Sequence, residues 1–281
     1  MDVPRTWEDV LKAPALLLSL ASDAHKRRVC LERLAAAGVT DVRVMEGVNA
    51  RTSVDALPSA WAVYGGVPKL DPSDACFNEH SKHQGMFLAQ LNAWKWIVDG
   101  GHPFASIFED DVLFHTQWDA LAPQYYAMTP KDFDTLYYGS HLTVDKSIMQ
   151  PIIQLPTFCQ QSYGLTRGSA KWLSWWVLSR PEGIRTMDIM LWLLMNKTLE
   201  SPLIRYTWYV WNARQFPDES ASTSKFDHAR EKDVGLVFQD STLPTSSNRS
   251  LRRGGFRSSS SRRWTSTKKP RSAWGRMSRV S

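Results

Sequence analysis

The sequence of 281 residues predicts an α/β fold, in which a mostly parallel sheet is flanked by helices. Short apolar runs alternate along the chain with helical segments, and short links join them, which is typical of parallel α/β units. One run, residues 104–108, ends directly in Glu109, Asp110 and Asp111. Because open α/β sheets bind ligands at the carboxyl ends of their strands, this acidic cluster marks the expected functional edge.

The first strand–helix–strand unit lies near the start of the chain. A strand is expected over residues 16–20, a helix over about 23–37 and a second strand within 42–48. Arg27 and Arg28 lie in the first turn of the helix, where the macrodipole disfavours cations. A neighbouring anion would explain them, and a solvated surface pair explains them equally well.

The later part of the chain continues the alternation. Residues 51–80 show little periodicity and predict a long loop, whereas a helix from about residue 79 carries one buried stripe and ends at Gly100. Further elements are expected as a short helix within 116–127, strands over 135–138 and 162–166, a helix capped by Ser169, a helix over 184–195 and a last strand over 234–238.

Three consecutive carboxylates repel one another, so folding them together costs free energy unless a cation or hydrogen-bond donors share the site. The preceding buried strand favours a metal or ligand site here over a solvated acidic turn. His141 follows the strand at 135–138 and could act as a ligand or an acid–base group, but a polar loop residue is the more common role.

Cysteine usage and the amino-terminal segment indicate a cytoplasmic protein. Cys30, Cys76 and Cys159 are odd in number and widely spaced, which is typical of a reducing compartment. The apolar run 13–20 follows acidic rather than basic residues, so we interpret it as the first strand and not as a signal peptide. No run approaches about 18 apolar residues, so no transmembrane segment is expected.

The composition changes near the end of the chain. Residues 241–281 hold 11 of the 34 basic side chains and none of the 28 acidic ones, so residues 1–240 carry 23 basic against 28 acidic side chains and a net charge of −5. The tail has too little apolar surface to offset chain entropy, so we expect disorder. Its charge permits binding to nucleic acid or another polyanion. We therefore predict a body of residues 1–240 and a basic tail of residues 241–281.

Several motifs occur in a recognisable order between residues 14 and 205. The series comprises 18–20 with Arg27 and Arg28, then 46–50, 85–94, 108–112, 136–139, 162–166 with Ala170, and finally Asp188. Taken together they resemble glycosyltransferase family 25, the group with bacterial lipopolysaccharide sugar transferases and collagen galactosyltransferases. The acidic motif alone is weakly specific, and the ordered series is more specific.

Two positions depart from the family pattern. Ala89 and Gln90 stand where the family usually has a Ser-His pair, and Gln161 stands where a His often precedes the later strand motif. These changes leave open an altered acceptor, or a weak or inactive enzyme.

The resemblance implies a GT-A type, Rossmann-like fold and an inverting sugar transfer from a nucleotide-diphosphate donor, expected to be a UDP-sugar. The acceptor would be a glycan, a lipid-glycan or a protein. Mn²⁺ or Mg²⁺ would neutralise the leaving diphosphate. Asp111 is the strongest expected metal ligand and Asp110 the next, with Asp110 also facing the donor. Glu109 would complete the metal shell or face the donor ribose.

The same resemblance assigns further roles. Asp188 matches the family's late aspartate and is the expected general base on the acceptor hydroxyl, although an acid near a helix amino terminus also has a purely structural explanation. Arg27 and Arg28 would lie near the pyrophosphate or the base of the nucleotide. Asn49 would contact the nucleotide.

Two other functions remain open. A metal-dependent enzyme acting on a phosphate ester also needs clustered carboxylates, but it normally needs further ligands at several strand ends, and only His141 and Asp134 lie nearby in the sequence. Alternatively, the body is catalytically inactive, and the basic tail makes the important contact with nucleic acid or another polyanion.

Overall fold

The fold is that of a computed structural model, which describes residues 3–49, 56–79, 81–141, 151–154, 158–196, 203–208, 233–240 and 243. The chain divides into two compact units, Met1–Ser246 and Ser247–Ser281, and every described residue belongs to the first. The predictions about the basic tail therefore concern residues of which only Leu243 is described. Within the described ranges, no helix has both the length and the apolar character that crossing a membrane requires.

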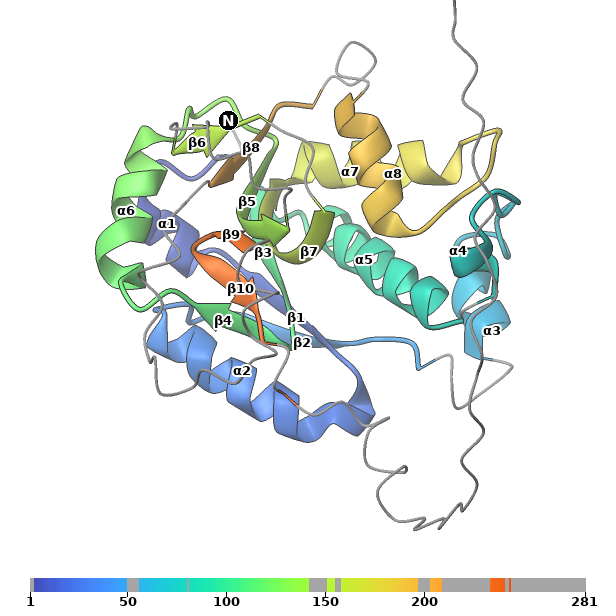
Figure 1. Cartoon of the computed structure of the whole chain (residues 1–281), viewed down its shortest axis with the longest axis horizontal. Helices are drawn as coiled ribbons and strands as arrows, with labels where there is room; N and C mark the ends of the chain where they lie inside the picture. The colour runs from blue at the N-terminus through green and yellow to red at the C-terminus, as the bar shows by residue number, and fades with distance from the viewer. Residues whose placement is uncertain are drawn as a thin grey trace, which may run out of the picture. The chain divides into compact units, whose positions relative to one another are not determined.

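Eight of the described strands form one mixed sheet in the order β2-β1-β3-β7-β5-β8-β6, with β9 paired to β5 (Figure 1). The strands are β1 (Ala15–Ser19), β2 (Val42–Glu46), β3 (Phe104–Glu109), β5 (Thr135–His141), β6 (Ile152–Ile153), β7 (Phe158–Thr166), β8 (Arg205–Trp208) and β9 (Asp233–Gly235). β1 pairs in parallel with β2 and β3, and β5 pairs in parallel with β8. The predicted α/β class is confirmed.

Strand β7 runs antiparallel to both of its neighbours, β3 and β5, so these two strands point in the same direction. Ser162 lies opposite Phe108, and Thr166 lies opposite Phe104. The amino end of β7 therefore lies beside the carboxyl end of β3. This arrangement brings Gln160, near the start of β7, to the edge of the sheet that carries the acidic cluster.

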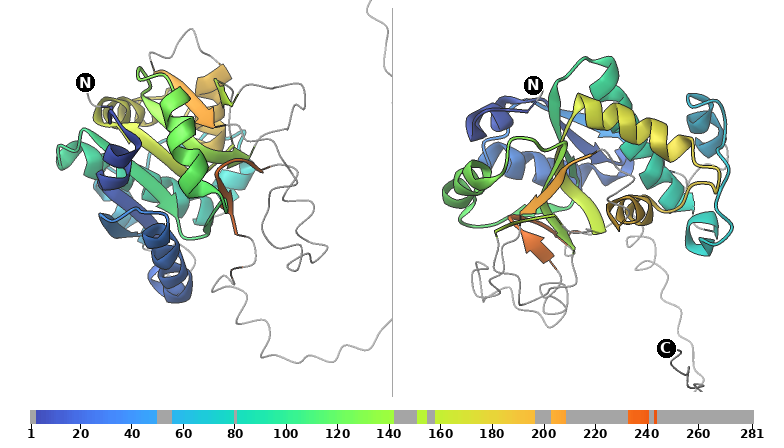
Figure 2. Two further views of the ribbon diagram at one scale, coloured as in Figure 1. Left: turned by 90° about the vertical axis from the view of Figure 1, so that its left-hand side faces the viewer. Right: turned by 90° about the horizontal axis from the view of Figure 1, so that it is seen from above.

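Helices cover both faces of the sheet (Figures 1 and 2). They are α1 (Trp7–Lys12), the 3₁₀ turn η1 (Ala21–Asp23), α2 (Ala24–Ala36), α3 (Ala56–Ala62), α4 (Ala75–Glu79), α5 (Ser81–Asp99), α6 (Trp118–Met128), α7 (Arg167–Leu178) and α8 (Met187–Asn196). Helices α3, α4, α5, α7 and α8 enclose a first core, and α1, α2 and α6 enclose a second. In β1, Leu16 and Leu18 face the first core, whereas Ala15 and Leu17 face the second, which explains the continuous apolar run.

The segment predicted as a long loop contains the short helices α3 and α4, so the prediction is wrong for these residues. Trp61 of α3 and Phe77 of α4 are buried against Phe87 of α5. Each helix is anchored by one large aromatic side chain and is too short to show a periodic apolar stripe. Hydrophobic spacing therefore does not reveal either helix.

Two helix starts differ from the prediction. Thr166, rather than Ser169, caps α7, because the Thr166 hydroxyl accepts a hydrogen bond from the Ser169 backbone N–H at 3.2 Å. Helix α8 begins at Met187, and Ile184 instead forms a parallel bridge with Leu70. The entry to α8 is therefore tied to the segment between α3 and α4.

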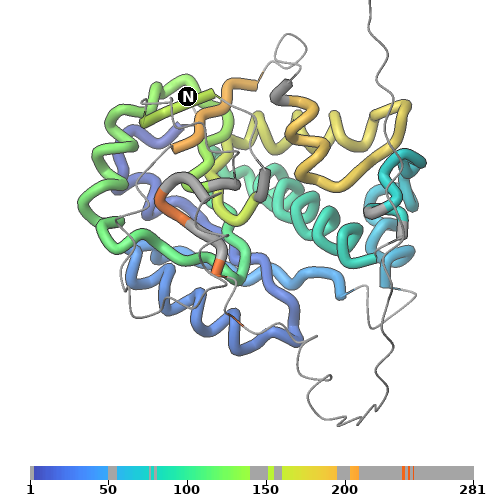
Figure 3. Tube along the Cα trace, viewed as in Figure 1, coloured from blue at the N-terminus to red at the C-terminus, as the bar shows by residue number. Residues whose placement is uncertain are grey.

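The predicted last strand is split into β9 and β10 (Val237–Gln239), and this segment closes the second core. β10 pairs with β4 (Val112–Phe114) in a separate two-stranded sheet, where Figure 3 shows the orange segment beside the green chain. Leu236 is fully buried, and Gly139 permits the approach because a Cβ there would lie 1.8 Å from the Val237 carbonyl oxygen. Asp240 then pairs with Arg33 of α2, with 2.7 Å between Oδ2 and Nη2.

Candidate functional site

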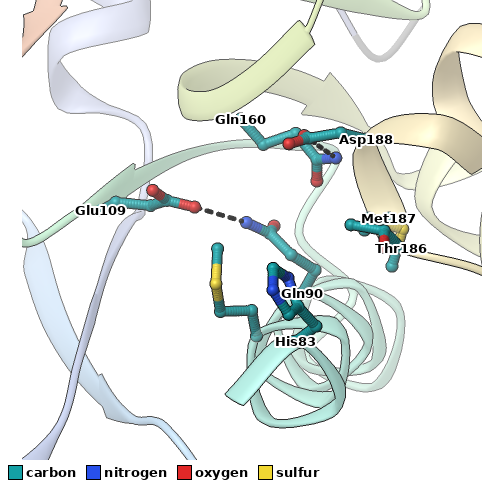
Figure 4. A pocket seen from close by; sticks show the side chains of 8 residues that line it. His83, Gln90, Glu109, Gln160, Thr186, Met187 and Asp188 are labelled. Carbon is teal, nitrogen blue, oxygen red and sulfur yellow. Dashed lines mark hydrogen bonds between the residues drawn. The ribbon is translucent and has the colours of Figure 1, made fainter. Parts of the chain in front are cut away.

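The acidic cluster lies at the carboxyl end of β3, but its three side chains point apart. Glu109 turns toward α5, where its Oε1 accepts a hydrogen bond from Gln90 Nε2 at 3.4 Å (Figure 4). Asp110 turns toward α2, where its Oδ1 lies 3.4 Å from Lys26 Nζ. Asp111 Oδ2 lies 3.9 Å from the same ammonium group. One carboxyl group is therefore separated from the other two.

Glu109 lines a pocket beside the first core. The other lining residues are His83, Met86, Gln90, Gln160, Thr186, Met187 and Asp188. The cavity volume is about 70 Å³, well below the roughly 300–1,000 Å³ that is typical of sites enclosing a whole small molecule. Figure 4 shows Glu109 and Asp188 on different sides of this space. The fold thereby brings together two acids that lie far apart in the sequence.

The environment of Glu109 favours its neutral form. Burial raises the pKa of Glu109 to about 8, and the neighbouring carboxylates add to this effect, Asp111 and Asp188 most strongly. The charge of Lys26 acts in the opposite direction and does not reverse the shift. The surroundings of Glu109 therefore disfavour its ionisation.

A chain of three hydrogen bonds fixes the group that faces Glu109. Trp94 Nε1 donates to the Tyr163 hydroxyl at 2.9 Å, and the Tyr163 hydroxyl donates to Gln90 Oε1 at 2.5 Å. Because an indole N–H can only donate, the single proton of Tyr163 is directed to Gln90. The Gln90 amide thus presents its oxygen to Tyr163 and its NH₂ group to Glu109, which fixes the orientation of the amide.

Asp188 lies in the first turn of α8, on the opposite wall of the pocket. Gln160 Nε2 donates a hydrogen bond to Asp188 Oδ1 at 3.2 Å (Figure 4). Since Gln160 comes from the start of β7 and Asp188 from α8, the antiparallel direction of β7 is what supplies this partner.

A clamp of two further aspartates holds the segment that leads into α8. Asp74 Oδ2 accepts hydrogen bonds from the backbone N–H and the hydroxyl of Thr186, at 2.9 and 3.0 Å. Asp71 Oδ2 lies 2.6 Å from Arg185 Nε. Hydrogen bonds from Ser73, and then from Arg185, lower the pKa of Asp71 to about 2. Both acids remain ionised near neutral pH and fix the wall that carries Asp188.

The sequence reasoning did not single out this clamp, because both acids fall in the stretch predicted as a loop. The available signal was Asp71 and Asp74 flanking Pro72 and Ser73, a pattern typical of a turn that leads into a helix. Gly183, at φ +107°, allows the two segments to meet, since a Cβ there would lie 2.7 Å from the Asp71 nitrogen. Only the folded chain shows which segment the turn holds.

Lys26 is a second residue that the sequence reasoning missed. It is only 6% exposed and lies on α2 with Cys30 and Leu34, so that its stem follows the buried face of the helix. Burial favours the neutral amine, but the charges of Asp110 and Asp111 outweigh it and raise the pKa of Lys26 above its ordinary value. The spacing of four residues from Lys26 to Cys30 was the available signal.

The other predicted donor-binding residues lie at several places. Arg27 Nη2 donates to the Leu20 carbonyl oxygen at 3.0 Å, just beyond the end of β1. Arg28 has a 63% exposed side chain and pairs with Glu32 at 2.8 Å on the surface of α2. Asn49 follows the end of β2 and is half-buried. Arg27 and Asn49 therefore lie just past the ends of strands that border the acidic edge, while Arg28 is directed to solvent.

Gln161 and His141 are two further positions that the sequence singles out. Gln161 is 1% exposed, and its amide group has no hydrogen-bond partner among the residues that the structure describes. The backbone of His141 lies in β5, opposite Phe158 and Asp233, while its side chain lies outside the described part of the chain.

The arrangement of the acids does not fit a divalent metal. Among the described residues, no group of three or more His, Cys, Asp and Glu side chains is arranged to hold a metal ion. Mg²⁺ in nucleotide sites is usually bound by one or two carboxylates, together with water and substrate phosphates, so the carboxylates must face a free position. Here Glu109 is hydrogen-bonded to Gln90, and Asp110 and Asp111 face the ammonium group of Lys26. The metal dependence that the family resemblance implies stays a prediction.

Fold and site define an α/β protein with an acidic pocket at the edge of its central sheet. No family model matches the chain, and no curated protein matches it, so the resemblance to glycosyltransferase family 25 rests on the motif residues alone. The structure is similar to the crystal structure of a glycosyltransferase involved in the glycosylation of the major capsid of PBCV-1, with a TM-score of 0.33 and 8% sequence identity. The match covers 86% of this chain and 99% of that one. At this TM-score we base no argument on the likeness.

Proposed function

We propose that the chain transfers a sugar from a nucleotide-diphosphate donor to an acceptor hydroxyl, with inversion at the anomeric carbon. The observation that carries the proposal is the position of Glu109 and Asp188 on different sides of one pocket, at the carboxyl end of β3. Ligands of open α/β sheets bind at this edge. Two carboxyl groups in distinct environments can serve distinct roles in one reaction.

In this proposal Asp188 is the general base. The acceptor oxygen forms a bond to the anomeric carbon, and the bond from that carbon to the diphosphate oxygen breaks. The diphosphate leaves with the electron pair, and the acceptor proton passes to Asp188. The hydrogen bond from Gln160 to Oδ1 orients the carboxylate. Glu109 binds a hydroxyl group of the donor sugar or ribose from the opposite wall.

The donor class rests on the family resemblance. We propose a UDP-sugar, with Arg27 and Asn49 near the nucleotide, and a glycan, a lipid-glycan or a protein as the acceptor. The divalent metal ion that the resemblance implies at Asp110 and Asp111 is not part of this proposal, because both carboxylates face Lys26. None of the roles of Asp188, Gln160 or Glu109 depends on that ion.

The test is the release of nucleoside diphosphate from a panel of UDP-sugars and GDP-sugars, since transferases often hydrolyse their donor slowly without an acceptor. We expect turnover of one donor, and a loss of about 10²–10⁴-fold in Asp188→Asn, the range typical of a missing general base. Asparagine retains Oδ1 as the acceptor for Gln160, so the wall should stay intact.

Asp119→Asn is the matched control, because Asp119 is also an acid in the first turn of a helix, on the opposite face of the sheet. It should leave turnover unchanged. If the panel gives no turnover and calorimetry detects no binding of any donor, the proposed function is wrong.

A further inference from the structure

The turn formed by Asp110 and Asp111, called the acidic turn below, already has a cation beside it. Lys26 Nζ lies 3.4 Å from Asp110 Oδ1 and 3.9 Å from Asp111 Oδ2. All three side chains are largely shielded from water, with exposures of 8% for Lys26, 13% for Asp110 and 16% for Asp111. Two neighbouring carboxylates in such surroundings need a positive charge beside them to remain ionised together. One buried ammonium group meets that need for both.

The position of Lys26 is fixed by its helix. Lys26, Cys30 and Leu34 occupy successive turns of α2, and all three are buried. The Cys30 and Leu34 side chains pack in the second core, so the helix cannot rotate to release the lysine without exposing them. Arg33 ties the same helix to the Val112 carbonyl oxygen, directly after the acidic turn, at 2.9 Å. The packing of α2 in the second core and the hydrogen bond from Arg33 to Val112 thus keep Lys26 beside the acidic turn.

The third carboxyl group, Glu109, has a partner of its own. Glu109 faces the other side of the sheet edge, where the oriented Gln90 amide donates to it. Two aspartates and a lysine remain, and a lysine ammonium repels a metal cation instead of binding it. A lysine can also face a diphosphate group, because Lys, like Arg and Mg²⁺, stabilises charge on transferring phosphoryl groups.

We propose that Lys26 takes the place of the divalent metal at the acidic turn. While Lys26 is present, Asp110 and Asp111 bind no Mn²⁺, and they acquire a Mn²⁺ site only when the ammonium group is removed. In the proposed sugar transfer, on which this last part rests, donor turnover is then independent of added metal.

The direct test is a titration of the full-length protein with Mn²⁺, in which electron paramagnetic resonance measures the free ion. The wild type should leave the signal of free Mn²⁺ undiminished. Lys26→Met should bind one equivalent, at least about tenfold more tightly than the wild type, because it removes the positive charge that faces both carboxylates. Mn²⁺ should also raise the Tm of Lys26→Met and not that of the wild type, which a merely structural lysine would not explain.

Two variants serve as controls. Lys26→Arg keeps the positive charge and should bind no Mn²⁺. Lys95→Met makes the same chemical change at a lysine that pairs with Asp99 on the surface, at 2.6 Å, and it should also bind none. If Lys26→Met fails to fold without Mn²⁺, the wild-type titration still decides: tight Mn²⁺ binding by the wild type that Asp111→Asn abolishes would overturn the proposal.

Donor turnover separates this proposal from the proposed function. Equal turnover in EDTA and in Mn²⁺ supports both. Turnover only with Mn²⁺ supports the sugar transfer and overturns the role of Lys26. If no donor is turned over, while Mn²⁺ binds to Lys26→Met but not to the wild type, the role of Lys26 stands without the transferase.

Discussion

Two buried tyrosines, one on each face of the sheet, make similar hydrogen bonds with different consequences. Tyr138 lies in the second core, and its hydroxyl pairs with Ser106 at 2.8 Å. Tyr163 lies in the first core, and its hydroxyl links Trp94 to Gln90. Both tyrosines are 1% exposed, and burial raises the pKa of both.

Burial and pairing therefore do not distinguish a functional hydroxyl from a structural one. The Tyr138 contact ends inside the core, whereas the chain that passes through Tyr163 ends on Glu109 at the wall of a pocket. The face of α5, α7 and α8 builds the site, and the face of α1, α2 and α6 holds its acidic turn in place. Variants on each face can show whether the two faces contribute separately to activity and stability.

The largest effect is expected from deleting β9 and β10, which contribute to the second core only. A chain ending at residue 232 loses Leu236 and Val237, each fully buried, at a cost of about 3–6 kcal/mol from roughly 1.5–3 kcal/mol for each side chain. It also removes Asp240 from Arg33. Thermal unfolding followed by circular dichroism should show a large loss of Tm relative to a chain ending at residue 246. Equal Tm values would mean that the second core does not need this segment.

A single added methyl group tests the close approach of β10 to Gly139. Gly139→Ala should destabilise the protein by about 1–3 kcal/mol or more, because the new Cβ would overlap the Val237 carbonyl oxygen. Gly168→Ala in α7 is the control, since the nearest atom to its Cβ would be Thr166 Oγ1 at 3.9 Å. It should be neutral or stabilising by up to about 1 kcal/mol. Urea unfolding measures both, and a neutral Gly139→Ala would contradict the close approach of β10.

The two tyrosines can be compared directly. Tyr138→Phe should cost about 1 kcal/mol of stability, the usual net value of one hydrogen bond, and Tyr163→Phe about 2 kcal/mol, because it removes two. Only Tyr163→Phe frees Gln90 to turn its oxygen toward Glu109, and we expect donor turnover to fall roughly tenfold, as the loss of about 1.4 kcal/mol would give. If both variants lower turnover equally, the chain through Tyr163 is only part of the core packing.

Acid should loosen the pocket wall through the clamp. The folded-state pKa of Asp71 is about 2, below its ordinary value of 3.8, so its contribution to stability is present above about pH 4 and is lost as the pH falls toward 2. Asp71→Asn should therefore unfold with a smaller change in stability between pH 4 and 2 than the wild type. An unchanged pH dependence would show that the contacts of Asp71 with Ser73 and Arg185 contribute no net stability.

The smallest effect on the fold is expected from removing residues 247–281, which hold all 11 basic side chains of the predicted tail. The chain ending at residue 246 should keep its Tm and its donor turnover. Any binding to nucleic acid should be lost, and in the full chain it should weaken steeply with salt. Binding that survives the deletion would place a polyanion site on the body.

The sequence predicts those parts of the fold whose patterns are local. The periodic apolar stripe of α5 and the continuous apolar runs of β1 and β3 each lie within one element. The structure contains all three elements. The direction of β7 has no such signature, because side chains alternate between the two faces of a sheet whichever way the strand runs. Without that direction, the contact of Gln160 with Asp188 could not be anticipated.

The same distinction applies to the candidate site. The position of Glu109 follows from a strand that ends in acids, and the resemblance by itself points to Asp188. Lys26 lies next to the two arginines that the sequence singles out, but one helical step decides which of the three meets the acidic turn. Asp71 and Asp74 become significant only through partners more than a hundred positions away, Arg185 and Thr186.

The pairing of β4 with β10 also sets an order of events during protein synthesis. Val112 emerges from the ribosome 125 positions before Val237, which at about 5–20 residues per second is an interval of roughly 6–25 s. Throughout it, the strand that leaves the acidic turn has an unpaired edge, which is open to other chains. The pocket side can be assembled once α8 has been made, whereas the opposite side must wait. A nascent chain therefore passes through a stage in which half of the molecule is complete and the other half needs protection, which is the stage that a chaperone would bind.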